Sequence, residues 1–122
     1  MRIEGKVCIV TGSARGIGEA IGMRLASEGA SVVFADINAE EAAVAAARCR
    51  EQGGKAISAR VDVTKRDQVR AMIDKTVAEF GKLDVMFNNA GVNKPQNFLE
   101  TTEENWHWIM TINGLGVMIG IQ

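Results

Sequence analysis

Glycines occupy positions 12, 16 and 18 in the segment TGSARGIG, which begins at Thr11. Glycine permits a tight turn and lets bare backbone approach a ligand, and a helix that begins there offers free N–H groups and the positive end of its dipole. These features suit a pyrophosphate. The spacing G-x-x-x-G-x-G differs from the common fingerprint G-x-G-x-x-G, and a plain strand-to-helix connection is the alternative. The position of the segment directly after the apolar run 6–11 favours anion binding.

An acidic residue follows at a distance typical of ribose recognition. Asp36 stands 18 residues beyond Gly18 (36 − 18), near where a carboxylate accepts the hydroxyls of an adenosine ribose. A solvated aspartate that leads into a helix is the alternative. Arg15 could instead contact a 2′-phosphate. A carboxylate about 4 Å from a phosphate repels it by roughly 4 kcal/mol at a dielectric constant of about 20, whereas an exposed ion pair between Arg15 and the phosphate would stabilise binding by only about 0–1 kcal/mol. These residues therefore favour NAD over NADP.

Two further apolar runs end in residues that could contact a nucleotide. Asp62 and Val63 follow the third run, where a carboxylate could accept from an adenine amino group while the valine packs on the ring. Asp62 could also simply help to cap the next helix. The segment Asn88-Asn89-Ala90-Gly91 follows the fourth run. Its amides can tie neighbouring loops together and its small residues leave room beside a ribose, although a tight Asn-rich turn is the alternative.

The order of the apolar runs predicts how these residues are positioned. Runs at residues 6–11, 31–36, 55–61 and 83–87 are typical of buried strands. Helical patterns lie between them, at residues 16–28, 38–53 and 64–80, and a last helix follows residues 101–104. This alternation predicts an α/β fold of the Rossmann type: a doubly wound parallel sheet of four strands, with four helices on both faces. Ligands of such sheets bind beyond the carboxyl ends of the strands, where all these segments stand.

Together, the glycine segment, Asp36, Asp62-Val63, Asn88-Asn-Ala-Gly91 and Asn113 resemble the short-chain dehydrogenase/reductase family, over the whole chain. The resemblance implies hydride transfer between NAD or NADP and an alcohol or carbonyl carbon. It implies cofactor contacts by Gly12, Ser13, Arg15, Gly16, Ile17 and Gly18 at the pyrophosphate and ribose, Asp36 and Ile37 at the adenosine, Asp62 and Val63 at adenine, and Asn89, Ala90 and Gly91 near the nicotinamide-side ribose. Asn113 matches the family's catalytic-site asparagine, which helps to keep a water and a lysine in a proton relay.

The family's other catalytic residues, a serine and a Tyr-x-x-x-Lys motif, are not present in these 122 residues, which contain no tyrosine. A positioned acid typically contributes about 10²–10⁴-fold to such a reaction. We therefore expect residues 1–122 to form the NAD-binding, N-terminal part of a longer single-domain enzyme, with the Ser, Tyr and Lys beyond Gln122. We expect this stretch alone to be inactive. A stand-alone dinucleotide-binding or redox-sensing module without catalysis is the alternative.

Composition limits the partners. Fourteen basic and fifteen acidic residues give a formal net charge of −1, so no broad field attracts nucleic acid or an anionic membrane. No apolar run approaches the roughly 20 residues of a membrane span, and Cys8 and Cys49 lack the spacing of a disulfide framework or a metal site. We expect a cytoplasmic protein that acts on a small alcohol or carbonyl compound and, by the family's habit, forms a homodimer or homotetramer. Asn93 and Lys94 are candidates to lie near the substrate.

Overall fold

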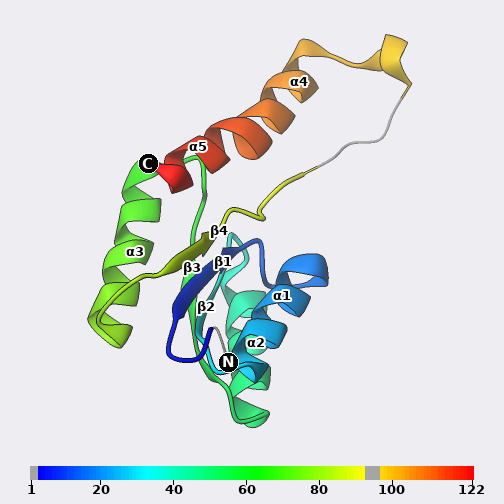
Figure 1. The fold of residues 1–122 in the computed structure, drawn as a ribbon. Helices are drawn as coiled ribbons and strands as arrows, with labels where there is room; N and C mark the ends of the chain where they lie inside the picture. The colour runs from blue at the N-terminus through cyan, green and yellow to red at the C-terminus, as the bar shows by residue number, and fades with distance from the viewer. Residues whose placement is uncertain (1–2, 93–96) are drawn as a thin grey trace.

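The computed structural model describes residues 3–92 and 97–122 of the chain. Strands and helices alternate along it (Figure 1). The elements are β1 (Val7–Thr11), α1 (Gly16–Ser27), β2 (Ser31–Asp36), α2 (Ala39–Glu51), β3 (Lys55–Arg60), α3 (Arg66–Phe80), β4 (Val85–Phe87), the short 3₁₀ turn η1 (Phe98–Glu100), α4 (Glu103–Met110), the π-helical turn η2 (Thr111–Leu115) and α5 (Gly116–Ile121).

The four strands form one parallel sheet in the order β3-β2-β1-β4. On one side β1 pairs with β2 along its whole length, from Val7 opposite Ser31 to Thr11 opposite Ala35. On its other side β1 pairs with β4. The chain therefore builds the sheet outward from β1 to β3 and then returns to add β4, which places a topological switch point between β1 and β4. This topology confirms the predicted doubly wound parallel sheet.

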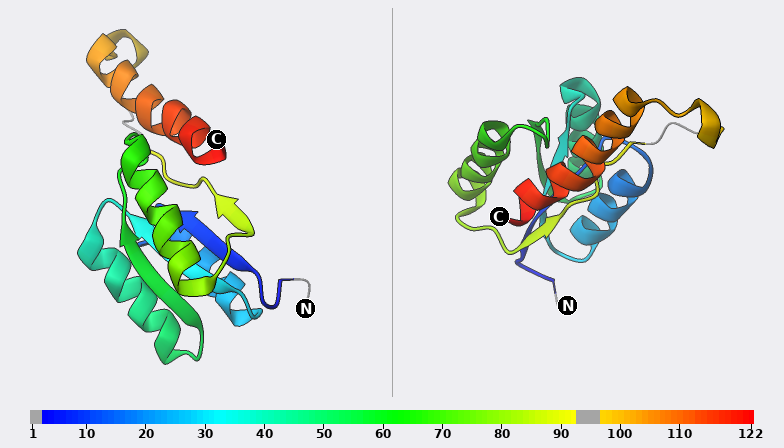
Figure 2. Two further views of the ribbon diagram at one scale, coloured as in Figure 1. Left: turned by 90° about the vertical axis from the view of Figure 1, so that its left-hand side faces the viewer. Right: turned by 90° about the horizontal axis from the view of Figure 1, so that it is seen from above.

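Helices cover both faces of the sheet, with α1 and α2 on one face and α3 and α5 on the other (Figures 1 and 2). Successive residues of a strand point to opposite faces, so Cys8 and Val10 enter the core under α1 and α2, whereas Ile9 enters the core under α3 and α5. Phe34 is fully buried in the first core. Cys49 lies there too; it and Cys8 are free thiols, and burial raises the pKa of both. The two cores make the sheet a firm platform for the loops at its carboxyl edge.

Local side-chain hydrogen bonds decide where α2 and α3 begin. The Oδ1 atom of Asn38 accepts from the N–H of Glu41 at 3.0 Å, which caps α2 at the predicted place. By contrast, α3 begins at Arg66, two residues later than the predicted start at Thr64. The reason is that the N–H and hydroxyl of Thr64 both donate to the side chain of Asp62, at 3.0 and 2.6 Å, which holds Thr64 in the preceding turn.

The last helical segment runs through α4, η2 and α5 and crosses the carboxyl edge of the sheet (Figure 1). Its α5 end lies beside α3, whereas α4 extends beyond the sheet (Figure 2). The π-helical turn in the middle departs from the regular helix that periodicity predicts, and such turns occur frequently at functional sites. In residues 3–92 and 97–122, no helix has both the length and the apolar character that a membrane crossing requires.

Candidate functional site

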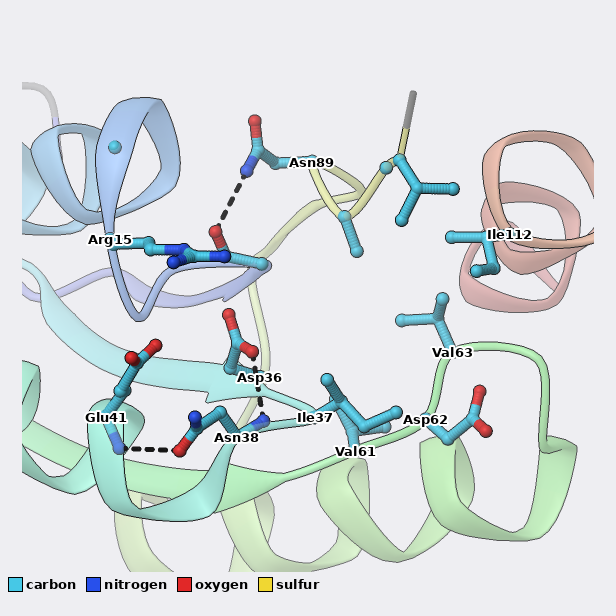
Figure 3. Close-up of a pocket in the computed structure, with 15 residues that line it drawn as sticks. Arg15, Asp36, Ile37, Asn38, Glu41, Val61, Asp62, Val63, Asn89 and Ile112 are labelled. Atoms are coloured by element: carbon cyan, nitrogen blue, oxygen red, sulfur yellow. Dashed lines mark hydrogen bonds between the residues drawn. The ribbon is translucent and has the colours of Figure 1, made fainter. Parts of the chain in front are cut away.

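A cleft opens at the carboxyl ends of the strands, between the turn after β1 and the loops after β2, β3 and β4 (Figure 3). Its volume of about 600 Å³ is in the range of ligand sites. It is lined by Gly12, Arg15, Gly16, Asp36, Ile37, Asn38, Glu41, Val61, Asp62, Val63, Asn89, Ala90, Gly91, Val92 and Ile112. The lining includes every residue predicted to bind a cofactor except Ser13, Ile17 and Gly18.

The turn between β1 and α1 uses backbone conformations that favour glycine. Gly12 has a φ of +67° and Gly16 a φ of +63°. A Cβ atom on Gly12 would lie 2.8 Å from the Cα atom of Ala90, so this glycine lets the two loops touch, whereas Gly16 faces open space. Arg15, the N-cap of α1, makes no side-chain hydrogen bond to the first helical turn. The N–H groups of that turn are thus left for an anion in the cleft.

The other predicted residues of this turn lie outside the cleft lining. Ser13 is fully buried; its hydroxyl donates to a β1 carbonyl at 2.7 Å and accepts from the N–H of Ala35 at 2.9 Å. Gly18 is buried where a Cβ atom would overlap the carbonyl oxygen of Gly12. Ile17 is 76% exposed. Ser13 and Gly18 therefore support the turn from behind, and only Ile17 presents a side chain to solvent.

The loop after β4 is tied to the end of β1 through Thr11 and Asn89. The Nδ2 group of Asn89 donates to the carbonyls of Thr11 at 3.1 Å and Gly12 at 3.3 Å. The buried hydroxyl of Thr11 accepts from the backbone N–H groups of Asn89 and Ala90, both at 3.1 Å, and donates to the carbonyl of Phe87 at 3.2 Å. The sequence predicted the tying role of the amides, but not that of Thr11. The glycine turn and the β4 loop thus form one wall of the cleft.

The carboxylate of Asp36 connects the end of β2 to the glycine turn. Its Oδ2 atom accepts from the N–H of Ala14 at 3.2 Å, and its Oδ1 atom accepts from the N–H of Asn38 at 3.0 Å. A carboxylate has about four acceptor positions, so both oxygens keep capacity for a ligand. Asp36 is half-buried and lines the cleft (Figure 3). Its two backbone partners therefore hold an anionic acceptor in a set orientation.

Arg15 and Glu41 add charge to the same end of the cleft. In Figure 3 Arg15 lies above Asp36, and Glu41 extends from the first turn of α2 in the direction of Arg15. Both side chains are exposed. Glu41 was not predicted as a site residue, because in the sequence it reads only as the partner of Asn38 at a helix start. Two carboxylates and one guanidinium therefore border this part of the cleft.

Asp62 and Val63 form a wall of the cleft after β3. The Asp62 carboxylate accepts hydrogen bonds from the hydroxyl and the N–H of Thr64. These bonds, of which the hydroxyl bond has the largest effect, hold the pKa of Asp62 below its usual value. The N–H of Asp62 donates to the Oε1 atom of Gln68 at 2.9 Å. Asp62 therefore shapes the loop before α3 instead of capping the helix. The side chains of Val63 and Ile112 make the nearby lining apolar (Figure 3).

Asn113 stands next to the cleft and holds a residue that lines it. Its Oδ1 atom accepts from the N–H of Val92 at 2.7 Å, and its Nδ2 group donates to the carbonyl of Val92 at 2.8 Å. Its neighbour Ile112 lines the cleft. The π-helical turn thus connects the last helix to the β4 loop by a two-point amide contact, which the sequence did not predict.

Sequence reasoning missed five lining residues: Asn38, Glu41, Val61, Val92 and Ile112. Asn38, Val61 and Val92 directly adjoin predicted site segments, so a wider window around each strand end would have included them. Ile112 directly precedes the predicted site residue Asn113, but only the fold shows that its side chain reaches the cleft from the last helix. Asn93 and Lys94, expected near the substrate, lie outside the described residues.

Comparison with known proteins agrees with this architecture. Residues 6–122 match the family model for short chain dehydrogenase. The chain is 38% identical over 117 residues to 3-oxoacyl-(acyl-carrier-protein) reductase FabG of Thermotoga maritima, which covers 96% of the chain and 48% of that protein. It is 39% identical over 117 residues to the (S)-acetoin-forming diacetyl reductase of Staphylococcus epidermidis, covering 96% of the chain and 46% of that protein.

A solved structure shares the fold closely. The crystal structure of a short-chain type dehydrogenase/reductase from Mycobacterium marinum superposes with a TM-score of 0.94 at 35% identity, covering 98% of the chain and 49% of that structure. The chain spans about half the length of the curated relatives it matches. Both the family model and this structural match extend over nearly all of its residues. The chain belongs to the short-chain dehydrogenase family.

Proposed function

We propose that the chain forms the cofactor-binding part of an NAD-dependent oxidoreductase that acts on a small alcohol or carbonyl compound. The observation that carries this proposal is the pairing of an open helix N-terminus at Gly16 with the oriented carboxylate of Asp36 in one cleft. Relatives described as a diacetyl reductase and a 3-oxoacyl-(acyl-carrier-protein) reductase support the reaction class. When bound, the nicotinamide cofactor supplies the hydride acceptor or donor.

The residues of the cleft fit a dinucleotide. Gly16 leaves open space in front of the first turn of α1, where a side chain would stand in the way of a pyrophosphate. Asp36 offers acceptors for two ribose hydroxyls. Val63 and Val61 offer an apolar wall beside the Asp62 carboxylate, which suits an adenine ring with its exocyclic amino group. The helix N-terminus, the Asp36 carboxylate and the apolar wall beside Asp62 thus correspond to the pyrophosphate, the ribose and the adenine of such a ligand.

We further propose that the cofactor is NAD and not NADP. Asp36 and Glu41 would both stand near a 2′-phosphate, whereas Arg15 alone could attract it. Repulsion between unit charges about 4 Å apart is roughly 4 kcal/mol at a dielectric constant of about 20. An exposed ion pair such as Arg15 with a phosphate stabilises binding by only about 0–1 kcal/mol. The balance of charges therefore supports discrimination against NADP.

The proton side of the reaction is proposed to depend on residues outside this stretch. The 122 residues contain no tyrosine, so no phenol in them can serve as the acid or base. Asn113 is the one family catalytic position present here, and its amide contact with Val92 supports a positioning role for it. We expect no turnover of small secondary alcohols by residues 1–122 with NAD. A rate within tenfold of an ordinary enzyme, about 10 s⁻¹, would contradict this expectation.

A titration tests the cofactor proposal directly. NADH and NADPH are added to the chain while the fluorescence of Trp106 and Trp108 is followed, and calorimetry measures the same equilibria. We expect NADH to bind more tightly than NADPH. Tighter binding of NADPH would give Arg15 the deciding role, and the absence of binding by both coenzymes would refute the proposed function.

A further inference from the structure

The last helix approaches the loop after β3 through a glycine. Gly116, the first residue of α5, is buried, and a Cβ atom added to it would lie 2.7 Å from Cγ2 and 3.3 Å from Cβ of Val63. Val63 lines the cleft. At these distances the backbone of α5 rests directly on the valine side chain, so no larger residue fits at position 116 unless Val63 or the helix moves.

The side chain of Val63 cannot readily move away from a larger residue at position 116. Its β-branched side chain has a single rotatable torsion and a strong rotamer preference. A rotation would carry its methyl groups to new places on the cleft wall. If the rotamer were kept, the Cγ2 atom of Val63 at 2.7 Å from the new Cβ would push the loop backbone, whose Asp62 is held by hydrogen bonds to Thr64 and Gln68. Either response changes the surface that the cleft presents after β3.

The same helix also reaches the other wall of the cleft. Ile112 lines the cleft, and the amide of Asn113 holds the backbone of Val92 at 2.7 and 2.8 Å. Gly116 stands one helical turn further along, against Val63. A displacement of the helix at Gly116 would therefore shift residues of both cleft walls, because the two contacts belong to one continuous helical segment.

We propose that Gly116 is a positioning residue of the nucleotide site: by omitting a side chain it lets α5 seat against Val63 and so sets the wall on which the adenine rests. The proposal depends on the proposed function, since it takes the occupant of that wall to be the adenine half of the cofactor. Gly116 itself does not line the cleft and acts only through Val63.

Gly114 offers a matched control in the same helical segment. It is exposed, and the nearest atom to a Cβ placed on it is the Cε of Met110, at 4.0 Å. Gly114→Ala therefore makes the same chemical change as Gly116→Ala, with an ordinary van der Waals contact in place of a clash. It should leave affinity within about twofold of the wild type.

The experiment measures the binding of NADH and of ADP-ribose by calorimetry, with circular dichroism to check folding. We expect Gly116→Ala to weaken both ligands by roughly tenfold or more. ADP-ribose is included because it carries the adenine half without the nicotinamide, and an effect through Val63 should reach it equally. An effect confined to NADH would overturn the assignment to the adenine wall.

The double variant Gly116→Ala/Val63→Ala decides how Gly116 acts, even if Gly116→Ala alone does not fold. Removing the valine methyl groups removes the atom at 2.7 Å, so the double variant should bind ADP-ribose within about twofold of Val63→Ala alone. A double variant much weaker than Val63→Ala would overturn the proposal, as would a folded Gly116→Ala with wild-type affinity. If the wild type binds neither ligand, the proposed function fails first, and the two failures are therefore distinguishable.

Discussion

Replacing Asp36 by asparagine should narrow the preference for NADH over NADPH by about 10²-fold. The substitution keeps the size of the side chain and an oxygen that can accept from the N–H of Asn38, but it removes the negative charge. The full repulsion of about 4 kcal/mol at 4 Å is reduced because Asp36 is half-buried and partly solvated. A residual of about 2.7 kcal/mol corresponds to a hundredfold change in the ratio of the two dissociation constants.

The assay is a calorimetric titration of the wild type and of Asp36→Asn with both coenzymes at one ionic strength. Asp67→Asn is the control, because Asp67 is exposed, stands in the first turn of α3 and does not line the cleft. The control tests whether a general loss of one negative charge has the same effect. A ratio for Asp36→Asn that stays within about threefold of the wild-type ratio would refute the electrostatic reasoning.

Two further predictions concern stability. Thr11→Val removes the hydroxyl that accepts from the backbone of the β4 loop and donates to Phe87, which should lower the free energy of unfolding by about 1–3 kcal/mol in urea titrations. The exposed Thr101→Val is its control, and equal effects of the two would contradict the anchoring role. Hydrogen bonds donated by Thr64 lower the pKa of Asp62, and hydrogen bonds donated by a backbone N–H and by Lys82 lower the pKa of Asp84. Because these pKa values are lower in the folded state, the two carboxylates stabilise the folded protein above the unfolded pKa of about 3.9. This stabilisation is lost as the pH falls through the folded pKa. The melting temperature should therefore fall less steeply between about pH 5 and 2 in Asp62→Asn than in the wild type. An equally steep fall would contradict the role given to the Asp62 carboxylate.

The order of strands and helices could be predicted from local sequence. Buried strands of a parallel sheet are continuous apolar runs, and helices carry a different period, so residues 31–36 were predicted with the bounds that the structure has. The glycine turn and Asp36 were predicted for a similar reason. In a parallel sheet every carboxyl strand end lies at one edge, so residues that follow the strands must face a shared space.

Contacts between distant segments could not be predicted in this way. Thr11 and the backbone of Asn89 meet across 78 positions only because β4 pairs beside β1. Ile112 reaches the cleft, and Gly116 reaches the side chain of Val63, because the last helix crosses the sheet edge, a placement that depends on packing against α3. The sequence by itself determined the elements and the chemistry at each strand end, because these follow from local backbone preferences and burial. Only the tertiary structure decided which side chains support that chemistry, because the partners are set by strand order and by how closely two backbones can approach.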